Sequence, residues 1–382
     1  MQHDYSSMLW LLLFIATLGL FYLISIISLI YGWDRLRVSN LQIRDFQHVT
    51  IIVAARNEEQ HISDCIRSLL HQSYPSTYIQ IIIVDDYSTD QTANNIKAFD
   101  GITYLQLSDW HLSGEIRSGK KKCIEYALTR ATGTYIMITD ADCVAPHNWV
   151  QSTVGAFQSE EADVVAGPVC INNTATFFNQ LQALDFWSYI SLSASCIGLN
   201  SPVMSNGANF SFRKQLFSDV KGYDGYEHIT SGDDVLLLHK FINQGAKVYF
   251  NKTIEALVGT KAEDSLLSFF TQRLRWASKT AAYRNVFLIV IIVMIYLYYV
   301  ALPFCLIAAI SHPVYIKWFA GIALMKSFID FIYLYRVLNF FNQRNLLRLF
   351  LPAQLFHVCY VLLVGAVALF VPLRWKGRKI YR

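Results

Sequence analysis

Residues 135–142 read YIMITDAD, an apolar run that ends directly on two aspartates. The run from Tyr135 to Thr139 predicts a strand that is buried on both faces, because no polar side chains alternate along it. Asp140 and Asp142 follow at a spacing of i and i+2, which in extended backbone turns both side chains to one side. Paired carboxylates suit Mg²⁺ or Mn²⁺. The stretch therefore predicts a strand that ends on a metal site.

The same pattern of strand and helix recurs before this stretch. Apolar runs at 49–53, 79–84 and 102–107 predict strands, and runs at 58–71, 89–99 and 120–129 predict helices. Alternation of this kind predicts an α/β fold, in which helices cover a mostly parallel, Rossmann-like sheet. We find no internal repeat and no low-complexity stretch.

Candidate site residues, most of them charged, follow the first two of these strands as well. Ala54, Arg56 and Glu58 come after the first, and the pair Asp85 and Asp86 comes after the second. The carboxyl ends of parallel strands meet at one edge, which is where open α/β sheets bind ligands. Carboxylates gathered there repel one another, and a divalent cation would relieve that repulsion.

Three further polar stretches are candidates for the same edge. Gly119 and Lys120 open a helix, where the lysine would either neutralise phosphate or form a solvated helix start; the glycine spacing is not that of a Walker A loop. A second stretch contains Asn206, Gly207 and Asn209. In the third, Asp233 and Asp234 precede a predicted helix at 235–244, so that one carboxylate can cap the helix while the other is free for chemistry.

The composition of the whole chain is unusually apolar for a soluble protein. Hydrophobic residues make up 54% of the 382 residues and charged residues 16%, against about 25% charged in an average soluble domain. The net charge of +4 is too small to argue for nucleic acid as a partner. None of the seven cysteines forms a CxxC pair, which predicts reduced thiols.

Four apolar runs are long enough to cross a bilayer, at 8–31, 286–310, 314–335 and 350–373. Arg35 and Arg37 follow the first, so the positive-inside rule places the N-terminus outside and the next domain in the cytoplasm. Basic residues at 374–379 also favour the cytoplasm, which conflicts with four full spans. Either the last segment is a hairpin or re-entrant, with a break near Gly365, or the positive-inside rule fails at this end. Lys326 and Asp330 are four residues apart in the third run and are expected to pair in the bundle.

A last motif lies just before the second apolar run. Residues 263–282 predict an amphipathic helix at the membrane surface, and its sequence QRLRW at 272–276 brings Gln272, Arg275 and Trp276 together. An interfacial helix explains the apolar side of this segment but not these three residues.

Taken in order, the motifs resemble those of inverting family 2 glycosyltransferases of the GT-A fold. They are VAARNE at 53–58, DD at 85–86, DAD at 140–142, GDD at 232–234 and QRLRW at 272–276. The last resembles the membrane-bound branch, which includes cellulose, hyaluronan and poly-N-acetylglucosamine synthases and ceramide glucosyltransferases.

The resemblance implies a role for each motif. Asp140 and Asp142 would hold Mg²⁺ or Mn²⁺ on the donor diphosphate, and Asp234 would be the catalytic base, with Asp233 standing where the family has Glu. The nucleotide-sugar site is expected to comprise Ala54, Arg56, Glu58, Asp85, Asp86, Lys120 and Asp140. Acceptor contacts are expected from Asn206, Gly207, Asn209 and Trp276, and Gln272, Arg275 and Trp276 are expected to close on diphosphate and acceptor.

We therefore expect a membrane anchor at 1–34, a cytosolic GT-A domain at 35–262, an interfacial helix at 263–285 and about three spans at 286–382. In the plasma (inner) membrane, among its lipids, the enzyme would move a sugar from a UDP-sugar to a hydroxyl of a lipid or polysaccharide acceptor. Two alternatives remain: a transporter or channel with a cytosolic nucleotide-binding regulatory domain, suggested by Lys326 and Asp330, and an inactive donor-binding scaffold.

Overall fold

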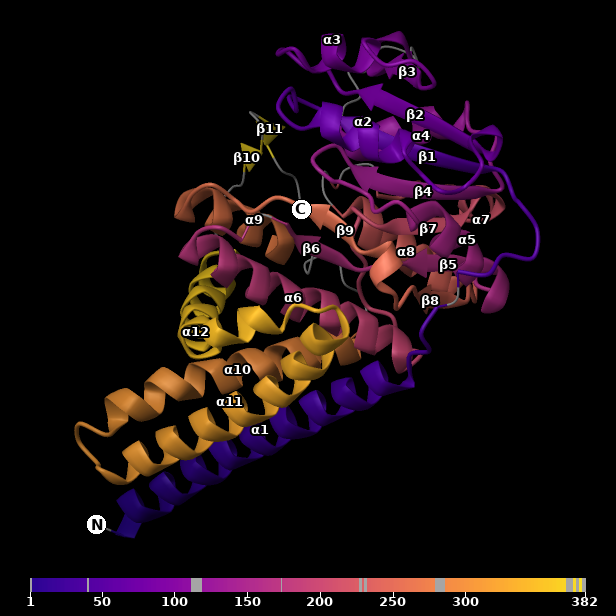
Figure 1. The fold of residues 1–382 in the computed structure, drawn as a ribbon. Coiled ribbons are helices and arrows are strands. Elements are labelled where there is room, and N and C mark those ends of the chain that lie inside the picture. The colour runs from indigo at the N-terminus through magenta and orange to yellow at the C-terminus, as the bar shows by residue number, and fades with distance from the viewer. Residues whose placement is uncertain are drawn as a thin grey trace. The chain divides into compact units, whose positions relative to one another are not determined.

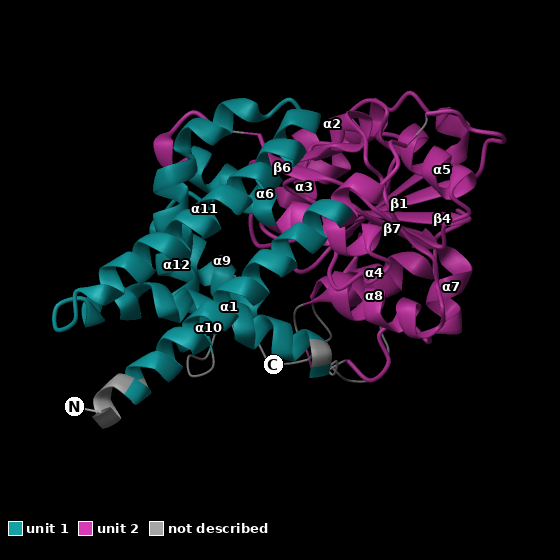
Figure 2. Ribbon diagram, turned by 90° about the horizontal axis from the view of Figure 1, so that it is seen from below, with its two compact units in different colours: residues 1–31, 180–188, 263–382 teal, residues 32–179, 189–262 magenta. Residues whose placement is uncertain are grey.

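The computed structural model describes residues 2–39, 41–110, 119–172, 174–226, 229, 232–278, 286–368, 374–375 and 378–379. The chain divides into two compact units (Figure 2). We call them the sheet unit, Gly32–Asn179 with Tyr189–Ala262, and the helical unit, Met1–Tyr31 with Gln180–Ser188 and Glu263–Arg382.

One seven-stranded sheet forms the centre of the sheet unit among the described residues, in the order β3-β2-β1-β4-β7-β5-β8 (Figure 1). Strand β1 pairs in parallel with both β2 and β4, and β7 is antiparallel to both of its neighbours. The predicted α/β fold with a mostly parallel sheet is therefore confirmed. The strands of this sheet are β1 (Val49–Ala55), β2 (Ile79–Asp85), β3 (Thr103–Gln106), β4 (Tyr135–Asp140), β5 (Val164–Ala166), β7 (Phe210–Arg213) and β8 (Val248–Phe250).

Helices connect these strands, and two short strands pair separately. The helices of the sheet unit are α2 (Ile62–Leu70), α3 (Thr92–Lys97), α4 (Lys120–Leu128), α5 (Trp149–Ser159), α7 (Lys214–Asp219) and α8 (Asp233–Asn243). Strands β6 (Val169–Ile171) and β9 (Val258–Thr260) run parallel to each other. A short hairpin near the C-terminus consists of β10 (Arg374–Trp375) and β11 (Arg378–Lys379).

Element boundaries differ from the sequence-based prediction where the backbone turns sharply. The helix expected from residue 58 begins at Ile62, because Asn57 has a positive φ of 49° and the chain forms a turn there. The helix expected from residue 235 begins at Asp233, directly after the left-handed Gly232 (φ 87°). Both shifts occur at the sheet edge where the candidate site residues lie.

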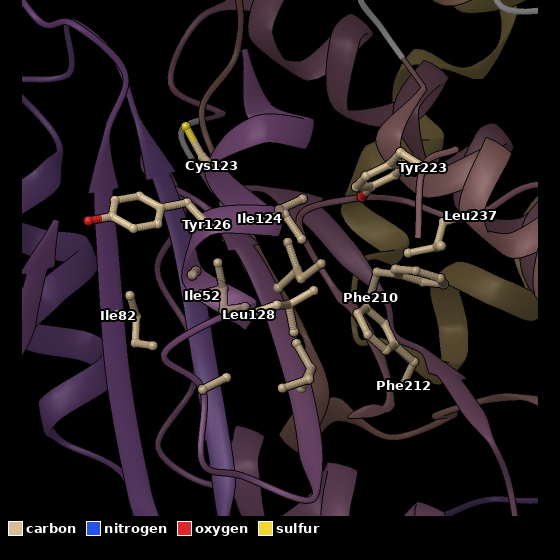
Figure 3. Packing of buried hydrophobic residues seen from close by; sticks show 14 of the residues in the cluster. Ile52, Ile82, Cys123, Ile124, Tyr126, Leu128, Phe210, Phe212, Tyr223 and Leu237 are labelled. Carbon is tan, nitrogen blue, oxygen red and sulfur yellow. The ribbon is translucent and has the colours of Figure 1, made fainter. Parts of the chain in front are cut away.

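Apolar side chains from strands and helices form the core of the sheet unit (Figure 3). Figure 3 shows Phe210 and Phe212 of β7 near Leu237 of α8, with Ile52 of β1 and Ile124 of α4 in the same cluster. All five are at most 1% exposed. Burial of each such side chain contributes about 1.5–3 kcal/mol, so this core fixes the strands that carry the site residues.

The helical unit consists of long apolar helices and the shorter helix α9, which precedes α10 in the chain. Its helices are α1 (Gln2–Arg35) up to Tyr31, α9 (Leu266–Ser278), α10 (Val286–Ala308), α11 (Val314–Phe340), α12 (Phe350–Val367) and the middle of α6 (Phe177–Gly198). Within the described residues, four segments are long and apolar enough to cross a membrane: Met8–Arg35, Leu288–Ala308, Val314–Phe340 and Arg344–Val367. Each contains most of one predicted run. Helix α12 includes Gly365 and ends at Val367, and residues 369–373 of the last predicted run lie outside the described residues.

Polar side chains join these apolar helices inside the unit. Lys326 Nζ lies 2.7 Å from Asp330 Oδ2, which confirms the expected pair. Tyr22 of α1 donates a 2.7 Å hydrogen bond to the other carboxylate oxygen, and Gln354 of α12 donates one of 3.2 Å to Oδ2. The pair is thus hydrogen-bonded on all sides by the protein, as expected of a structural ion pair.

Gly133, in the segment before β4, lies close against the backbone of β1. A Cβ atom at this position would lie 2.4 Å from the Thr50 nitrogen and 2.6 Å from the Val49 carbonyl carbon. We predict that Gly133→Ala lowers the free energy of unfolding by about 1–3 kcal/mol, because backbone must move to admit the methyl group. Thermal unfolding followed by tryptophan fluorescence measures the change. Gly321→Ala in α11 is the control, since nothing lies within 4 Å of its Cβ position; equal melting temperatures for the two variants would contradict the close approach.

Candidate active site

Lys120, the first residue of α4, connects three parts of the sheet unit. Its Nζ lies 2.6 Å from Asp140 Oδ1 at the end of β4, 3.1 Å from Asp233 Oδ2 at the start of α8, and 3.2 Å from the Gly207 carbonyl oxygen. Burial by itself would lower the pKa of Lys120, but the carboxylates of Asp140 and Asp233 outweigh it and raise this pKa. The lysine stays charged, and the interpretation as a solvated helix start is wrong for it.

Asp140 and Asp142 lie together as the sequence predicts. One ligand atom from each, with the Cys143 sulfur, falls within a group whose atoms are at most 4.8 Å apart. Burial, then Asp140 and Glu58, raise the pKa of Asp142 to about 6, and Lys261 opposes the shift. Such crowding of carboxylates is what a bound cation relieves.

The donor set of this cluster fits a hard divalent cation. Burial raises the pKa of the Cys143 thiol well above its ordinary value, with the nearby carboxylates adding to the effect. A protonated thiol is a poor metal ligand, because the thiolate is the form that binds. The two aspartates are therefore the ligands that the cluster offers, and carboxylate oxygens favour Mg²⁺ or Mn²⁺ over softer metals.

Hydrogen bonds join the loops that follow β1 and β2. Arg56 Nη1 donates a 2.6 Å hydrogen bond to the Asp86 carbonyl oxygen, and the Asn57 side chain accepts one of 2.9 Å from the Thr89 backbone. Ala54 pairs in register with Asp140 across the two neighbouring strands. Arg56 and Ala54 are thus placed at the expected edge, while Glu58 acts on Asp142 through its charge.

Asp85 and Asp86 are both buried at the end of β2. Burial raises the pKa of Asp85, and a hydrogen bond from Ser88 partly offsets the rise. The Gly119 backbone N–H donates a 3.1 Å hydrogen bond to Asp86 Oδ2. Asp86 therefore fixes the backbone just before Lys120, which adds a structural task to the nucleotide contact predicted for it.

Asp234 is directed at the loop that contains Asn206 and Gly207. The Gly207 backbone N–H donates a 2.9 Å hydrogen bond to Asp234 Oδ2, and the Val235 N–H donates one of 2.8 Å to Oδ1. Gly207 is also close to Lys120, whose Nζ would be 2.7 Å from a Cβ at this position. The structure thus brings Asp233, Asp234 and this loop to the edge where Asp140 lies.

Asn209 does not fit the acceptor contact expected for it. Its side-chain amide donates to the carbonyl oxygens of Pro168 (2.9 Å) and Ala256 (2.8 Å), and its Oδ1 accepts from Trp149 Nε1 (2.9 Å). Only 2% of the residue is exposed. Both amide hydrogens are used inside the fold, so the side chain has no donor for a substrate.

Gln272, Arg275 and Trp276 all lie on α9 in the helical unit. Gln272 Nε2 donates a 2.7 Å hydrogen bond to Glu263 Oε1, and the Trp276 ring lies 6.0 Å from that of Phe186. Their joint presence on one helix follows the sequence. Their closure on a donor bound in the sheet unit stays a prediction.

Sequence reasoning missed Lys261, whose charge acts on the acidic cluster. Lys261 directly follows β9, and its Nζ lies 2.8 Å from His61 Nε2. Its positive charge lowers the pKa of Asp142. The rule that functional residues follow strands applies to Lys261, but it works only where the sequence reveals the strand. The strand itself, Val258–Thr260, is too short to show a pattern in the sequence.

The hydrogen bonds of Asn209 lead to a stability prediction. We expect Asn209→Ala to lower the free energy of unfolding by about 2 kcal/mol or more, because Trp149 Nε1 and two carbonyl oxygens lose a buried partner. Thermal unfolding is the measurement, with Asn206→Ala as the control, since that side chain makes one local bond to the Ala208 N–H (3.0 Å). A wild-type melting temperature for Asn209→Ala would return this residue to the candidate substrate contacts.

Comparisons with known proteins agree with the geometry of the sheet unit. Residues 50–220 match the model of glycosyl transferase family 2. The poly-beta-1,6-N-acetyl-D-glucosamine synthase of Staphylococcus epidermidis is 24% identical over 247 residues, which are 64% of this chain and 57% of the relative. That of Staphylococcus aureus (strain COL) is 23% identical over 243 residues, 62% and 56% of the two chains. The chain thus spans little more than half the length of these relatives.

A solved structure has a similar fold. The mannosyltransferase of Pyrobaculum calidifontis, in complex with GDP-Man and Mn²⁺, superposes with a TM-score of 0.52 and 16% identity, over 93% of this chain and 99% of that one. The likeness extends to the fold, and it confirms the expected GT-A architecture flanked by long apolar helices. The chain therefore has the GT-A fold, and its residues 50–220 resemble the domain of glycosyl transferase family 2.

Proposed function

We propose that the protein is a membrane-embedded inverting glycosyltransferase that moves N-acetylglucosamine from UDP-N-acetylglucosamine to a hydroxyl of a growing glycan. The observation that carries the proposal is that Lys120 pairs with both Asp140 and Asp233 at the carboxyl edge of the sheet, with Asp142 grouped beside Asp140. The sugar and the acceptor follow from what the staphylococcal relatives are named for.

The donor side of the proposal concerns the diphosphate. Asp140 and Asp142 would hold the Mg²⁺ or Mn²⁺, which when bound supplies Lewis-acid stabilisation of the charge on the departing diphosphate. Arg56, Glu58, Asp85 and Asp86 would border the nucleotide. The Lys120 ammonium group keeps Asp140 in place at 2.6 Å and adds positive charge near the phosphates.

The acceptor side needs a base, and the geometry favours Asp234 over Asp233. The carboxylate of Asp233 is engaged in an ion pair with Lys120 at 3.1 Å. Asp234 is oriented by the Gly207 and Val235 backbone N–H groups instead. It would take the proton of the acceptor hydroxyl as the sugar transfers. The acceptor oxygen would bond to the sugar carbon as the bond to the diphosphate breaks, and a single displacement of this kind would invert the configuration at that carbon.

The resemblance also gives the QRLRW segment a role in the proposed reaction. Arg275 would offset charge on the diphosphate, Gln272 would hydrogen-bond the reacting groups, and Trp276 would present an aromatic face to the sugar, together with contacts from Asn206 and Gly207. These roles rest on the resemblance of the motif to that of membrane-bound synthases.

The membrane setting is also part of the proposal. The four apolar helices would cross the plasma (inner) membrane, with residues 1–34 as an anchor and 286–382 as the C-terminal membrane region. Residues 35–262 would be the cytoplasmic catalytic domain, because Arg35 and Arg37 favour the cytoplasmic side. Residues 263–285 would connect the two at the membrane surface, and those from 279 onward lie outside the described part of this segment.

A donor panel tests the proposal directly. Full-length protein in nanodiscs with Mn²⁺ is given UDP-N-acetylglucosamine, UDP-glucose or GDP-mannose, and products in lipid and polysaccharide fractions are measured by mass spectrometry. Polymer or oligomer from the first donor alone is the expected result. Transfer from another donor, or to lipid only, would revise the substrate; no transfer from any donor would overturn the enzymatic function and favour a scaffold or transporter.

Removing one metal ligand is expected to weaken donor binding. Asp142→Ala should reduce the Mn²⁺-dependent affinity for UDP by about tenfold or more, because one of two charged ligands is lost. Isothermal titration with UDP, with and without Mn²⁺, measures this. Asp64→Ala is the control, since Asp64 is an exposed residue of α2 that pairs with Arg67. Unchanged Mn²⁺-dependent binding in Asp142→Ala would remove Asp142 from the metal site.

Replacing the base should stop transfer without stopping donor binding. We expect Asp234→Asn to lower kcat by about 10²-fold or more, since general-base catalysis contributes roughly 10²–10⁴, while UDP affinity stays within about twofold. Asp233→Asn is the matched variant and should lose about tenfold or less. A larger loss of kcat in Asp233→Asn than in Asp234→Asn would reverse the assignment, and thermal unfolding of both variants verifies that they fold.

A further inference from the structure

Asp185 is the only charged residue in the 22-residue helix α6. It lies in the helical unit, and 5% of the residue is exposed. Burial alone would raise its pKa, but Arg273 and His357 outweigh burial and lower it to about 2. Asp185 is therefore an ionised carboxylate among apolar helices, which requires partners that hold the charge.

Both oxygens of this carboxylate are fully used by neighbouring helices. Oδ2 accepts from Arg273 of α9, through Nη2 at 2.7 Å and Nε at 3.2 Å. Oδ1 lies 2.8 Å from His357 Nδ1 and accepts a 2.6 Å hydrogen bond from the Tyr360 hydroxyl, both on α12. One side chain thus joins α6, α9 and α12 within the helical unit.

Arg273 is the second residue of the QRLRW motif, so its ion pair with Asp185 constrains the whole motif. Its guanidinium group lies 4.3 Å from the ring centre of Phe269 and 4.3 Å from that of Trp276. It also donates a hydrogen bond to the side-chain oxygen of Gln272. The ion pair with Asp185 therefore orders a residue on each side of Arg273, and both are in the proposed catalytic set.

Stability gives a weak reason for such an ion pair. Desolvation of two charges offsets most of their attraction, and a well-packed apolar pair is often as stable or more so. What the pair supplies is direction, because a helix that packs through apolar contacts alone can rotate at small cost. Successive side chains point about 100° apart around a helix axis. The directions of Gln272 and Trp276 are therefore fixed relative to that of Arg273, and a rotation of α9 would move all three together.

We propose that Asp185 is a positioning residue that holds α9 in one rotation, through Arg273, against His357 and Tyr360 of α12. The inference rests on the proposed function, because it gives Asp185 the task of presenting Gln272, Arg275 and Trp276 together. A donor contact by Asp185 itself is not part of it. The substitution of Asp185 should therefore act on turnover and leave donor binding alone.

Asp330 provides a matched control for burial and charge. It is also a buried carboxylate of the helical unit, and it accepts hydrogen bonds from Lys326, Tyr22 and Gln354. None of these partners is in the QRLRW motif. A drop in stability shared by Asp185→Asn and Asp330→Asn is therefore what a purely structural role predicts for both.

The kinetic test uses full-length protein in nanodiscs with UDP-N-acetylglucosamine and Mn²⁺. Asp185→Asn should lower kcat by about tenfold or more with the donor KM within about twofold, because misplaced catalytic groups reduce turnover. Asp330→Asn should keep the wild-type kcat at a similar drop in melting temperature. Arg273→Lys, which keeps the charge and removes the planar fork of donors, should fall between wild type and Asp185→Asn. Equal kcat values for the two Asn variants would overturn the inference.

A second measurement does not depend on activity. Hydrogen exchange of peptides from residues 266–278 should accelerate about tenfold or more in Asp185→Asn and stay at the wild-type rate in Asp330→Asn. Wild-type exchange in Asp185→Asn also overturns the inference. If the wild type transfers no sugar while exchange in α9 responds as expected, the proposed function fails and the anchoring of α9 stands. If Asp185→Asn does not fold, His357→Gln, which removes one of the partners of the carboxylate, is judged by the same two measurements.

Discussion

The candidate site depends on the ion pairs that the Lys120 ammonium group makes with two carboxylates. Lys120 Nζ lies 2.6 Å from Asp140 and 3.1 Å from Asp233, and these two carboxylates come from the end of β4 and the start of α8. Two negative charges brought together at a partly buried edge repel each other, and the repulsion grows as water is removed. A single cation between them turns this cost into an attraction. The contact with the Gly207 carbonyl oxygen extends the same link to the loop that orients Asp234.

How much the sequence predicts depends on whether a feature is local. The apolar run 135–139 and the aspartates after it predict β4, its burial and the placement of Asp140 and Asp142, because strand geometry alone determines them. The roles of Lys120 and Asn209 were not predictable in this way. A lysine at a helix start looks the same in the sequence whether it faces water or two carboxylates. Asn209 has its partners 60, 41 and 47 positions away.

The helical unit shows the same difference with two buried carboxylates. Lys326 and Asp330 are four residues apart on α11, so their pairing is read directly from helical spacing. Asp185 and Arg273 are separated by 88 positions, and only a general argument connects them. A lone charge in an otherwise uncharged helix needs a counter-charge nearby. Arginine in the QRLRW motif supplies it, yet the resemblance to known enzymes directs attention to its neighbours Gln272, Arg275 and Trp276.

A buried ion pair fixes the rotation of a helix that apolar packing alone leaves poorly defined. Side chains such as Leu and Phe give adhesion between helices with little preference for one rotation, and inside a bilayer lipid tails compete for the same surfaces. A carboxylate that meets a guanidinium fork and two further donors has one good geometry, since a rotation that separates it from any of these donors leaves a buried charge less well compensated. Asp185 therefore restricts α9 far more than the apolar packing around it does. In the proposed reaction α9 would present an amide, a guanidinium and an indole to one substrate, and that task needs a fixed rotation more than it needs added stability.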